Sequence, residues 1–554
     1  MRFSASHFLP SPRGPLTLAW AAALWIGTVC NWPLWQRMAA LSDLQNAQGL
    51  IFIAVFAGIV TALSGALLSL LAWRVTIKPV LTVALLSAAA LAYFMGSYGV
   101  VIDPTMVVNI LQTDSREAGD LLNGRLGLSL LVLAGLPLAW LRRQKPLTPL
   151  RWAPRLGLNL LSFAAGIGLT AGLVFSSFAE LASTMRNEPQ LRYMINPLNL
   201  YWSVGVVVAE ANAKPAGPPK VVGADAHLAD RPAGAKPPLL MLVVGETARA
   251  SSFSLNGYAR PTNPELAKLP VLNFANVTSC GTSTAASLPC MFSHLGREAY
   301  GGQKSHQENL LDLLQRAGLA VLWLDNQSGC KGLCDRVPSS SATQPAAGAP
   351  PLPAGLCDTS GECLDEALLS GLDQRLAALD PARVARGVVL VMHQMGSHGP
   401  AYYKRSPPEL KLFQPECKSN ALQQCQRAQV VNAYDNSIVT TDRLLARSIA
   451  WLQSQSRRFD TRLYYVSDHG ESLGENNIFL HGMPYAVAPR DQIHVPMLLW
   501  LGDAPALEQQ CLKGKRDQPL SHDNLFHTVL GLMGVQTTLY RAEWDFIASC
   551  RSAG

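Results

Sequence analysis

Residues 239–246 read LLMLVVGE, an unbroken apolar run that ends in a carboxylate. Four more short apolar runs follow: LAVLWLD at 319–325, GVVLVMH at 387–393, RLYYVSD at 462–468 and VPMLLWL at 495–501. Helix-like patterns lie between them, for example QENLLDLLQRAG at 307–318. Buried strands that alternate with helices are typical of α/β proteins. We therefore expect an α/β domain with a mainly parallel sheet between helices.

The ends of these runs carry polar side chains. Four of the five runs end in or beside a charged or metal-binding residue: Glu246, Asp325, His393, and Asp468 followed by His469. In open α/β sheets, ligands bind beyond the carboxyl ends of the strands. An Asp-His pair alone also fits a surface turn. However, carboxylates at two strand ends would repel each other unless a cation or proton lay between them, and the donor atoms suit zinc.

The segment SCGTSTAASLPCMFS at 279–293 places small hydroxyl residues before an expected helix. A helix N-terminus attracts anions, and a hydroxyl beside zinc can act as a nucleophile. Ordinary N-capping by Ser or Thr is the alternative. The residues alone leave four candidates for the nucleophile: Thr282, Ser283, Thr284 and Ser287.

Further candidates follow the strands. His393 and His398 lie in MHQMGSHGP, His481 lies in FLHGMPYA, and Lys331 lies between two cysteines. Such residues could bind a second metal ion or a phosphate. We assign ordinary structural roles to the remaining histidines, which are His7, His227, His294, His306, His494, His522 and His527.

The N-terminal third has a different composition. Hydrophobic residues make up 49% of the 554 residues and charged residues only 15%, and the shortage of charge is concentrated in residues 15–179. Runs long enough, or nearly so, to cross a hydrocarbon core of about 30 Å occur in this part. We expect five membrane helices, at 15–35, 49–73, 79–101, 125–141 and 156–179.

Positive residues flank alternate spans. Arg2 and Arg13 precede the first span, Arg74 and Lys78 follow the second, and a basic cluster separates the fourth from the fifth, at Arg142, Arg143, Lys145, Arg151 and Arg155. Lys and Arg favour the cytoplasmic side of a membrane. The N-terminus is therefore expected in the cytoplasm, and everything after about residue 180 outside it.

The cysteines support this topology. Ten of the eleven lie after residue 279, and eight form close pairs: Cys280 and Cys290, Cys330 and Cys334, Cys357 and Cys363, and Cys417 and Cys425. Such pairs fit short-loop disulfides in an oxidising compartment, or zinc-binding thiolates. None has the two-residue spacing of a zinc knuckle, which favours disulfides. Cys511 and Cys550 are candidates for a fifth bridge.

Two connecting segments complete the organisation. Residues 180–238 contain interfacial aromatic residues and then an Ala/Pro/Gly-rich linker, so we expect a membrane domain at 1–179, a bridge at 180–238 and a catalytic domain at 239–554. Loop 102–124 places Asn109, Thr113 and Glu117 on one helical face. That loop fits either a solvated connector or a grip on a lipid headgroup. The net charge of +7 is modest, and no basic cluster resembles a nucleic-acid site.

Six motifs together resemble the phosphoethanolamine transferases that modify lipid A, a family that includes the mobile colistin-resistance enzymes. The motifs are NILQTD (109–114), VVGETAR (243–249), NVTSCGTSTAASLPCMFS (276–293), DNQSGCKGLCDR (325–336), MHQMGSHGPAYYKR (392–405) and YVSDHGESLGENNIFLHGMPYA (465–486). The resemblance covers essentially the whole chain. It implies an alkaline-phosphatase-like fold in the C-terminal domain.

The resemblance also implies roles for single residues. Glu246, Thr284, Asp468 and His469 would hold one tightly bound zinc ion, with Thr284 as the nucleophile. The phosphoryl group or a second zinc ion would be bound by Lys331, His393, His398 and His481, of which His398 and His481 are the better metal ligands. Glu471 would tune His469. The lipid headgroup would be held by Asn109, Thr113 and Glu117.

The implied function is a bacterial inner-membrane enzyme, monomeric and multi-pass, with a periplasmic catalytic domain. It would move phosphoethanolamine from phosphatidylethanolamine to lipid A through a phospho-threonine intermediate, and so confer polymyxin resistance. The rival enzymes are a core-sugar phosphoethanolamine transferase and a related membrane phosphoglycerol transferase or sulfatase. A polymyxin-binding or assembly protein with a relict metal site is the non-enzymatic alternative.

Overall fold

The computed structural model describes residues 14–113, 115–144, 151–213, 217–303, 305–358 and 361–551, without the side chains of residues 115–117. This part of the chain divides into two compact units. One consists of Met1–Val107 and Leu122–Val207, and the other of Val108–Leu121 and Val208–Gly554. We retain the expected domain boundaries at residues 179 and 238 as a proposal.

The first unit is helical. Among its described residues, four helices are long and apolar enough to cross a membrane: Ala47–Leu70 (α3), Ile77–Tyr98 (α4), Gly124–Arg143 (α7, η4 and α8) and Trp152–Ser176 (α9). The first expected span is a shorter apolar helix, Pro15–Cys30 (α1 and η2), followed by α2 at Trp32–Ala39. The later helices are α10 (Phe178–Asn187) and α11 (Leu198–Ala213).

The second unit contains an eight-stranded sheet within the described residues, in the order β11-β3-β10-β7-β2-β6-β4-β5. The central strands are β2 (Pro238–Gly245), β4 (Ala320–Asp325), β6 (Val388–His393) and β7 (Asp460–Ser467), and all pair in parallel. β10 (His494–Leu501) is antiparallel to both its neighbours, β7 and β3 (Leu272–Thr278). β5 (Ser339–Ser341) and β11 (Leu520–Ser521) complete the edges. The prediction of a mainly parallel sheet is confirmed.

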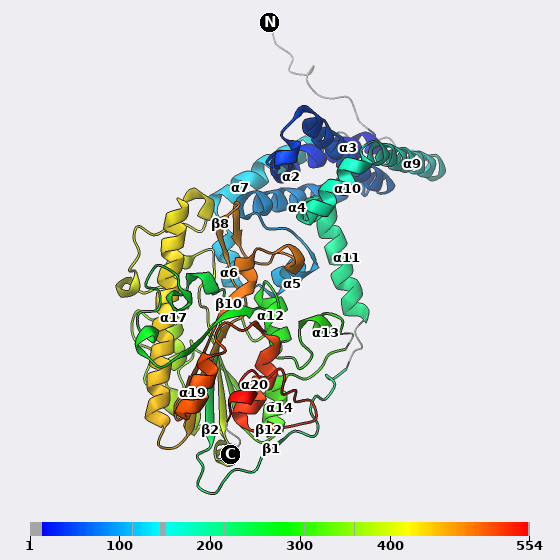
Figure 1. Ribbon diagram of the computed structural model, residues 1–554. Coiled ribbons are helices and arrows are strands. Elements are labelled where there is room, and N and C mark those ends of the chain that lie inside the picture. Colours follow the sequence, from blue (N-terminus) through cyan, green and yellow to red (C-terminus); the bar gives the residue numbers. More distant parts are fainter. Residues whose placement is uncertain are drawn as a thin grey trace. The chain divides into compact units, whose positions relative to one another are not determined.

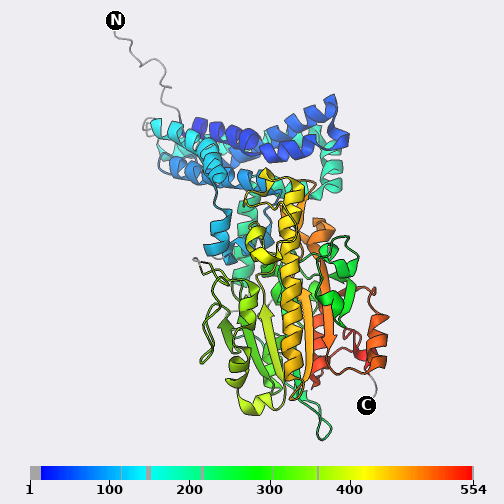
Figure 2. The ribbon, with the colours of Figure 1, turned by 90° about the vertical axis from the view of Figure 1, so that its left-hand side faces the viewer.

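Helices cover both faces of this sheet (Figure 1). α14 (Leu310–Arg316) and α20 (Asp523–Met533) pack on one face, where they share a core with Leu240, Leu242 and Val244 of β2. The alternate residues of β2 point to the other face, because successive side chains of a strand alternate. The long helix α17 (Arg427–Gln455) runs along the strands on that face (Figure 2). Both faces are therefore buried, as the unbroken apolar runs require.

Shorter elements surround the sheet. α12 (Thr284–Met291) follows β3, and α13 (Arg297–Gly301) follows α12. β8 (Ser472–Glu475) and β9 (Ile478–Leu480) form a hairpin after β7, and β1 (His227–Leu228) pairs with β12 (Val535–Gln536). The remaining helices are α15 (Leu372–Ala377), α16 (Pro381–Val384), α18 (Arg490–Ile493) and α19 (Ala506–Lys513).

Within the described residues, the second unit contains all four expected disulfides and a fifth. The bridges are Cys280–Cys290, Cys330–Cys334, Cys357–Cys363, Cys417–Cys425 and Cys511–Cys550. The eleventh cysteine, Cys30, is a buried thiol in the first unit. The pairing of ten cysteines agrees with an oxidising environment for the second unit.

This pairing predicts the number of reactive thiols. Protein denatured without reductant should incorporate one alkylating group, at Cys30, and eleven after reduction. Intact-mass spectrometry before and after reduction measures both numbers. Alkylation of several cysteines without reductant would contradict both the disulfides and the expected topology.

Candidate functional site

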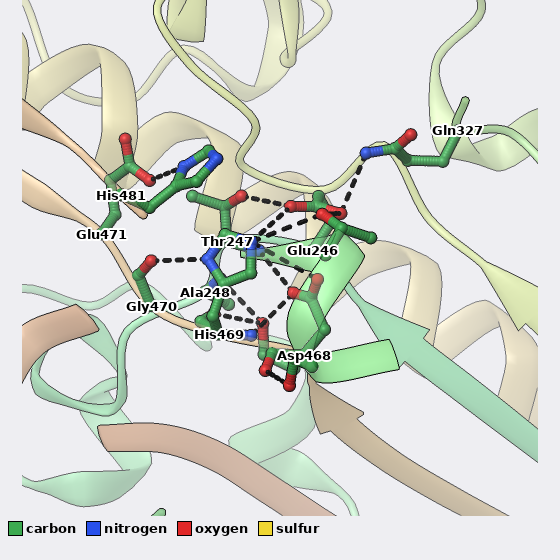
Figure 3. Close-up of polar contacts among 12 residues, drawn as sticks. Glu246, Thr247, Ala248, Gln327, Asp468, His469, Gly470, Glu471 and His481 are labelled. Atoms are coloured by element: carbon green, nitrogen blue, oxygen red, sulfur yellow. Dashed lines mark hydrogen bonds and ion pairs between the residues drawn. The ribbon is translucent and has the colours of Figure 1, made fainter. Parts of the chain in front are cut away.

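The site lies at the carboxyl edge of the parallel strands. The register pairs Val244 with His393 and Gly245 with Ser467, so the residues that follow β2 and β7 come together. Glu246 follows β2, whereas Asp468 and His469 follow β7. Figure 3 shows these three side chains converging. The antiparallel β10 ends at the opposite edge, and its run therefore carries no site residue.

Glu246, Asp468 and His469 form a tight and fully buried cluster. His469 Nε2 lies 3.1 Å from Glu246 Oε1 and 3.4 Å from Asp468 Oδ2. His469 Nδ1 donates to the carbonyl of Gly470 at 2.8 Å, which orients Nε2 toward the two carboxylates. All three side chains are 0% exposed. Two carboxylates without solvent require compensating positive charge.

The pKa values in the cluster reflect the need for positive charge beside the two carboxylates. Burial, together with the charge of Glu246, raises the pKa of Asp468 to about 7. Burial alone would lower the pKa of His469, but the charges of Asp468 and Glu246 raise it to about 10. Burial alone would raise the pKa of Glu246, yet the hydrogen bond and charge of His469 hold it well below its usual range. The two carboxylates therefore retain a proton on the imidazole, or accept a cation in its place.

The donor set fits a zinc ion. One atom from each of Glu246, Asp468 and His469 lies within 4.8 Å of the others. Carboxylate oxygen and neutral imidazole nitrogen are ordinary zinc ligands, and three protein ligands leave a fourth position open. The hydrogen bond from His469 Nδ1 to a backbone carbonyl is the usual support for a metal-bound histidine.

Thr284 points into this cluster. It is the first residue of α12, and its Oγ1 donates to Glu246 Oε2 at 3.0 Å and lies 3.4 Å from His469 Nε2. The other hydroxyl candidates do not reach the carboxylates: Thr282 donates to the carbonyl of Met483, and Ser287 to the carbonyl of Asp468. Ser283 is the N-cap but makes no side-chain capping bond. The geometry thus separates Thr284 from its three neighbours.

A second group adjoins the first. Glu471, which is fully buried, accepts from Tyr402 Oη at 2.6 Å and pairs with His481 Nδ1 at 2.9 Å. The His481 ring lies 4.3 Å from the His469 ring and 5.6 Å from the His398 ring, centroid to centroid. Burial raises the pKa of Glu471 to about 8. Donor atoms of His469, Glu471 and His481 come within 4.8 Å of one another, so Glu471 joins His481 in the second candidate ligand set.

His393 and Lys331 occupy different surroundings. His393 Nδ1 lies 3.1 Å from Asp325 Oδ2, which also accepts from Trp323 Nε1 at 2.8 Å. The Nε2 atom of His393 is buried and has no hydrogen-bond partner among the described residues. Lys331 Nζ contacts Ser328 Oγ at 2.9 Å and the carbonyl of Gln112 at 3.1 Å.

The loop residues are placed only in part. Asn109 and Thr113 belong to the portion of loop 102–124 that joins the second unit, and Thr113 Oγ1 donates to the carbonyl of Asn109 at 2.8 Å. The loop forms α5 (Pro104–Gln112) and α6 (Ser115–Leu121). The side chain of Glu117 lies outside the described atoms, so its expected role stays a prediction.

Two residues at the site were missed by the sequence reasoning. Gln327 Nε2 donates to Glu246 Oε2 at 2.9 Å (Figure 3). Thr247 has φ of 60°, an unusual conformation for a β-branched residue, and its hydroxyl donates to Glu246 Oε1 at 2.6 Å. Gln327 follows a strand end, as the other site residues do, so the same signal could have identified it.

His522, for which we expected a structural role, connects two segments that carry site residues. Its Nε2 donates to the carbonyl of Ser467 at 2.9 Å, and its Nδ1 accepts from the backbone N–H of Cys280 at 3.0 Å. It therefore joins the segment before Thr284 to the end of β7. The neutral imidazole makes both hydrogen bonds. A protonated ring could not accept the bond from the N–H of Cys280 at Nδ1.

This bonding predicts acid sensitivity. Burial lowers the pKa of His522 from 6.5 to about 4, so between these values the unfolded chain binds more protons than the folded one. Stability should therefore fall as pH decreases from about 6.5 to about 4, by up to about 3 kcal/mol from this residue. Thermal unfolding of the full chain and of His522→Gln at pH 7 and pH 5 measures the effect. Identical pH dependence in both proteins would contradict it.

The comparisons with known proteins agree with this geometry. A family model described as sulfatase matches residues 238–535, and one described as phosphoethanolamine transferase EptA/EptB matches residues 60–211. Phosphoethanolamine transferase EptA of Escherichia coli K12 is 40% identical over 549 residues, covering 96% of this chain and 97% of the relative. Phosphatidylethanolamine transferase Mcr-1 of E. coli is 38% identical, with the same coverage of both chains.

A solved structure matches the whole chain as well. The integral membrane lipooligosaccharide phosphoethanolamine transferase A of Neisseria meningitidis aligns with a TM-score of 0.88 at 34% identity. The alignment covers 97% of this chain and 98% of that structure. Both the helical unit and the sheet-containing unit therefore have counterparts in one relative.

Proposed function

The chain belongs to the phosphoethanolamine transferase family, and from this membership we propose that it moves phosphoethanolamine from phosphatidylethanolamine to a phosphate of lipid A. The observation that carries the chemical part of the proposal is the approach of Thr284 Oγ1 to Glu246 and His469 in a buried cluster. A hydroxyl between a carboxylate and an imidazole is placed to act as a nucleophile.

In the first step, the Thr284 oxygen attacks the phosphorus of the donor. The new oxygen–phosphorus bond forms as the bond from phosphorus to diacylglycerol breaks. The Thr284 hydroxyl donates a hydrogen bond to Glu246 Oε2, which can receive the proton, and the diacylglycerol oxygen takes up a proton as it leaves. Thr284 then carries phosphoethanolamine as a phosphodiester.

In the second step, a phosphate oxygen of lipid A attacks the same phosphorus. The Thr284 oxygen leaves and regains a proton, and the product carries phosphoethanolamine on the lipid A phosphate. Diacylglycerol departs before the acceptor reacts, so this order of steps predicts ping-pong kinetics.

We propose that Glu246, Asp468 and His469, with the Thr284 oxygen as the fourth ligand, hold a zinc ion. Bound zinc would supply the positive charge that lowers the pKa of the hydroxyl. The observation behind this part is the set of donor atoms within 4.8 Å, with two buried carboxylates that need a cation. His481 and Glu471, with His398 nearby, are the candidate ligands of a second ion or of the transferred phosphate.

We also propose that the second unit lies in the periplasm of a bacterium, with the apolar helices in the inner membrane. The five disulfides within the described residues support an oxidising compartment. Donor and acceptor would then lie in one leaflet, and membrane anchoring would raise their effective concentration at Thr284. The added ammonium would offset phosphate charge and weaken binding of cationic peptides such as polymyxins.

Mass spectrometry of lipid A from a heterologous host tests the proposal. Expression of the chain should add phosphoethanolamine to lipid A, and the host carrying an empty vector should lack it. Phosphoethanolamine on a core sugar, or a phosphoglycerol group, would identify one of the rival enzymes. Unmodified lipopolysaccharide despite full expression would contradict the proposed activity.

A further inference from the structure

Asp120 in α6 makes an unusual set of contacts within the second unit. Its carboxylate lies 2.6 Å from Lys404 Nζ and 3.7 Å from the Arg405 guanidinium. Asn420 Nδ2 donates to the backbone carbonyl of Asp120 at 2.9 Å and to its carboxylate at 3.3 Å. The Asp120 side chain is only 12% exposed. Such charge-assisted bonds away from solvent are stronger than ordinary surface ion pairs.

These contacts belong to a network that reaches the candidate site. Arg405 also pairs with Glu362, and Lys404 lies 3.7 Å from Glu362. Arg405 Nε donates to the carbonyl of His398 at 2.9 Å, and the Arg405 side chain is only 5% exposed. Asp120 is thus connected through Arg405 to His398, whose ring lies beside that of His481.

The same loop is attached at a second point. Lys331 Nζ contacts the carbonyl of Gln112 at 3.1 Å. The described residues of segment 108–121 therefore contact the rest of the second unit at two places, through Gln112 with Lys331 and through Asp120 with Lys404, Arg405 and Asn420. Asn109 and Thr113 lie in the portion near Lys331.

We propose that Asp120 is a positioning residue that fastens loop 108–121 to the catalytic unit and so presents Asn109 and Thr113 to the donor headgroup. The proposal rests on the proposed function for the identity of the lipid, but the fastening itself does not. Without the Asp120 carboxylate, the loop would keep the Lys331 contact and the bond from Asn420 to the backbone carbonyl of residue 120, but it would lose the ion pairs with Lys404 and Arg405. Donor binding should weaken, whereas the Thr284 cluster should keep its geometry.

The fastening is tested by hydrogen–deuterium exchange on the full-length protein in detergent. We compare wild type, Asp120→Asn, Lys404→Met and the double variant. A matched control is Asp503→Asn, which alters another acid–lysine pair, Lys236–Asp503 at 3.1 Å, whose side chains are about half exposed. Exchange in residues 108–121 should accelerate by about five- to tenfold in both single variants, and no further in the double variant.

Kinetics with phosphatidylethanolamine vesicles test the positioning role. The KM for the donor should rise by about fivefold in Asp120→Asn, while kcat changes by less than about twofold. Unchanged exchange would overturn the fastening, and faster exchange with an unchanged KM would overturn the positioning role. If wild type shows no transfer at all, the proposed function fails, and the exchange data still decide the fastening.

Discussion

Thr284→Val is expected to reduce phosphoethanolamine transfer by at least about a thousandfold, because it removes the hydroxyl that contacts both Glu246 and His469 and would carry the covalent intermediate. Valine keeps the shape of threonine but lacks the Oγ1 that lies 3.0 Å from Glu246. Transfer in vitro and the mass of lipid A from expressing cells measure the loss. The variant should unfold at nearly the wild-type temperature, since one buried hydrogen bond contributes only about 1 kcal/mol.

Thr284→Ser is the matched control for this experiment. Serine restores the hydroxyl, so transfer should recover to well above the level of the valine variant. In wild type incubated with donor alone, the peptide that contains Thr284 should gain the mass of one phosphoethanolamine group. Transfer by Thr284→Val at the wild-type rate, or the added mass on another residue, would disprove the assignment of the nucleophile.

The second large effect is expected from Glu246→Gln. This substitution removes one of two buried carboxylates, so the site loses a negative charge that favours a cation. Zinc affinity should fall by at least about tenfold, and transfer should fall with it. Zinc added to apo wild type should raise the unfolding temperature, because saturation at a hundred times Kd stabilises the folded state by about 2.7 kcal/mol. At the same zinc concentration the variant should show a rise of at most about half this size, since a tenfold weaker site is stabilised by about 1.4 kcal/mol.

Elemental analysis measures the zinc content, and thermal unfolding measures the stabilisation by zinc. Both measurements are independent of transfer activity. Glu409→Gln serves as the control, because the Glu409 side chain is 60% exposed and pairs with Arg443 on the surface. Its zinc content should equal that of wild type. A Glu246→Gln variant that binds zinc as tightly as wild type would disprove the proposed ligand set.

Much of the molecule could be predicted because its signals are local. Apolar runs of about twenty residues predict membrane helices whatever their neighbours, since backbone polar groups in lipid must bond within a helix. The unbroken run at 239–246 likewise predicts a strand buried on both faces. The confirmed parallel sheet then brings Glu246, Asp468 and His469 together, because parallel strands end at one edge.

Other features depend on atoms that come from distant parts of the chain. The residues of the CGTST segment alone do not separate Thr284 from Thr282, Ser283 and Ser287, because the choice depends on which hydroxyl meets Glu246 across the fold. The sequence likewise does not reveal that α6 would join the catalytic unit through Asp120.

The long helices, the buried strands and the edge at which the polar residues meet can therefore be predicted from the sequence, since these follow from hydrophobic periodicity and strand direction. Which hydroxyl faces the carboxylates, and which residues α6 contacts, depend on tertiary contacts that the sequence does not reveal. A hydrogen bond depends on positions within a few tenths of an ångström, and those positions are set by the packing of segments far apart in sequence.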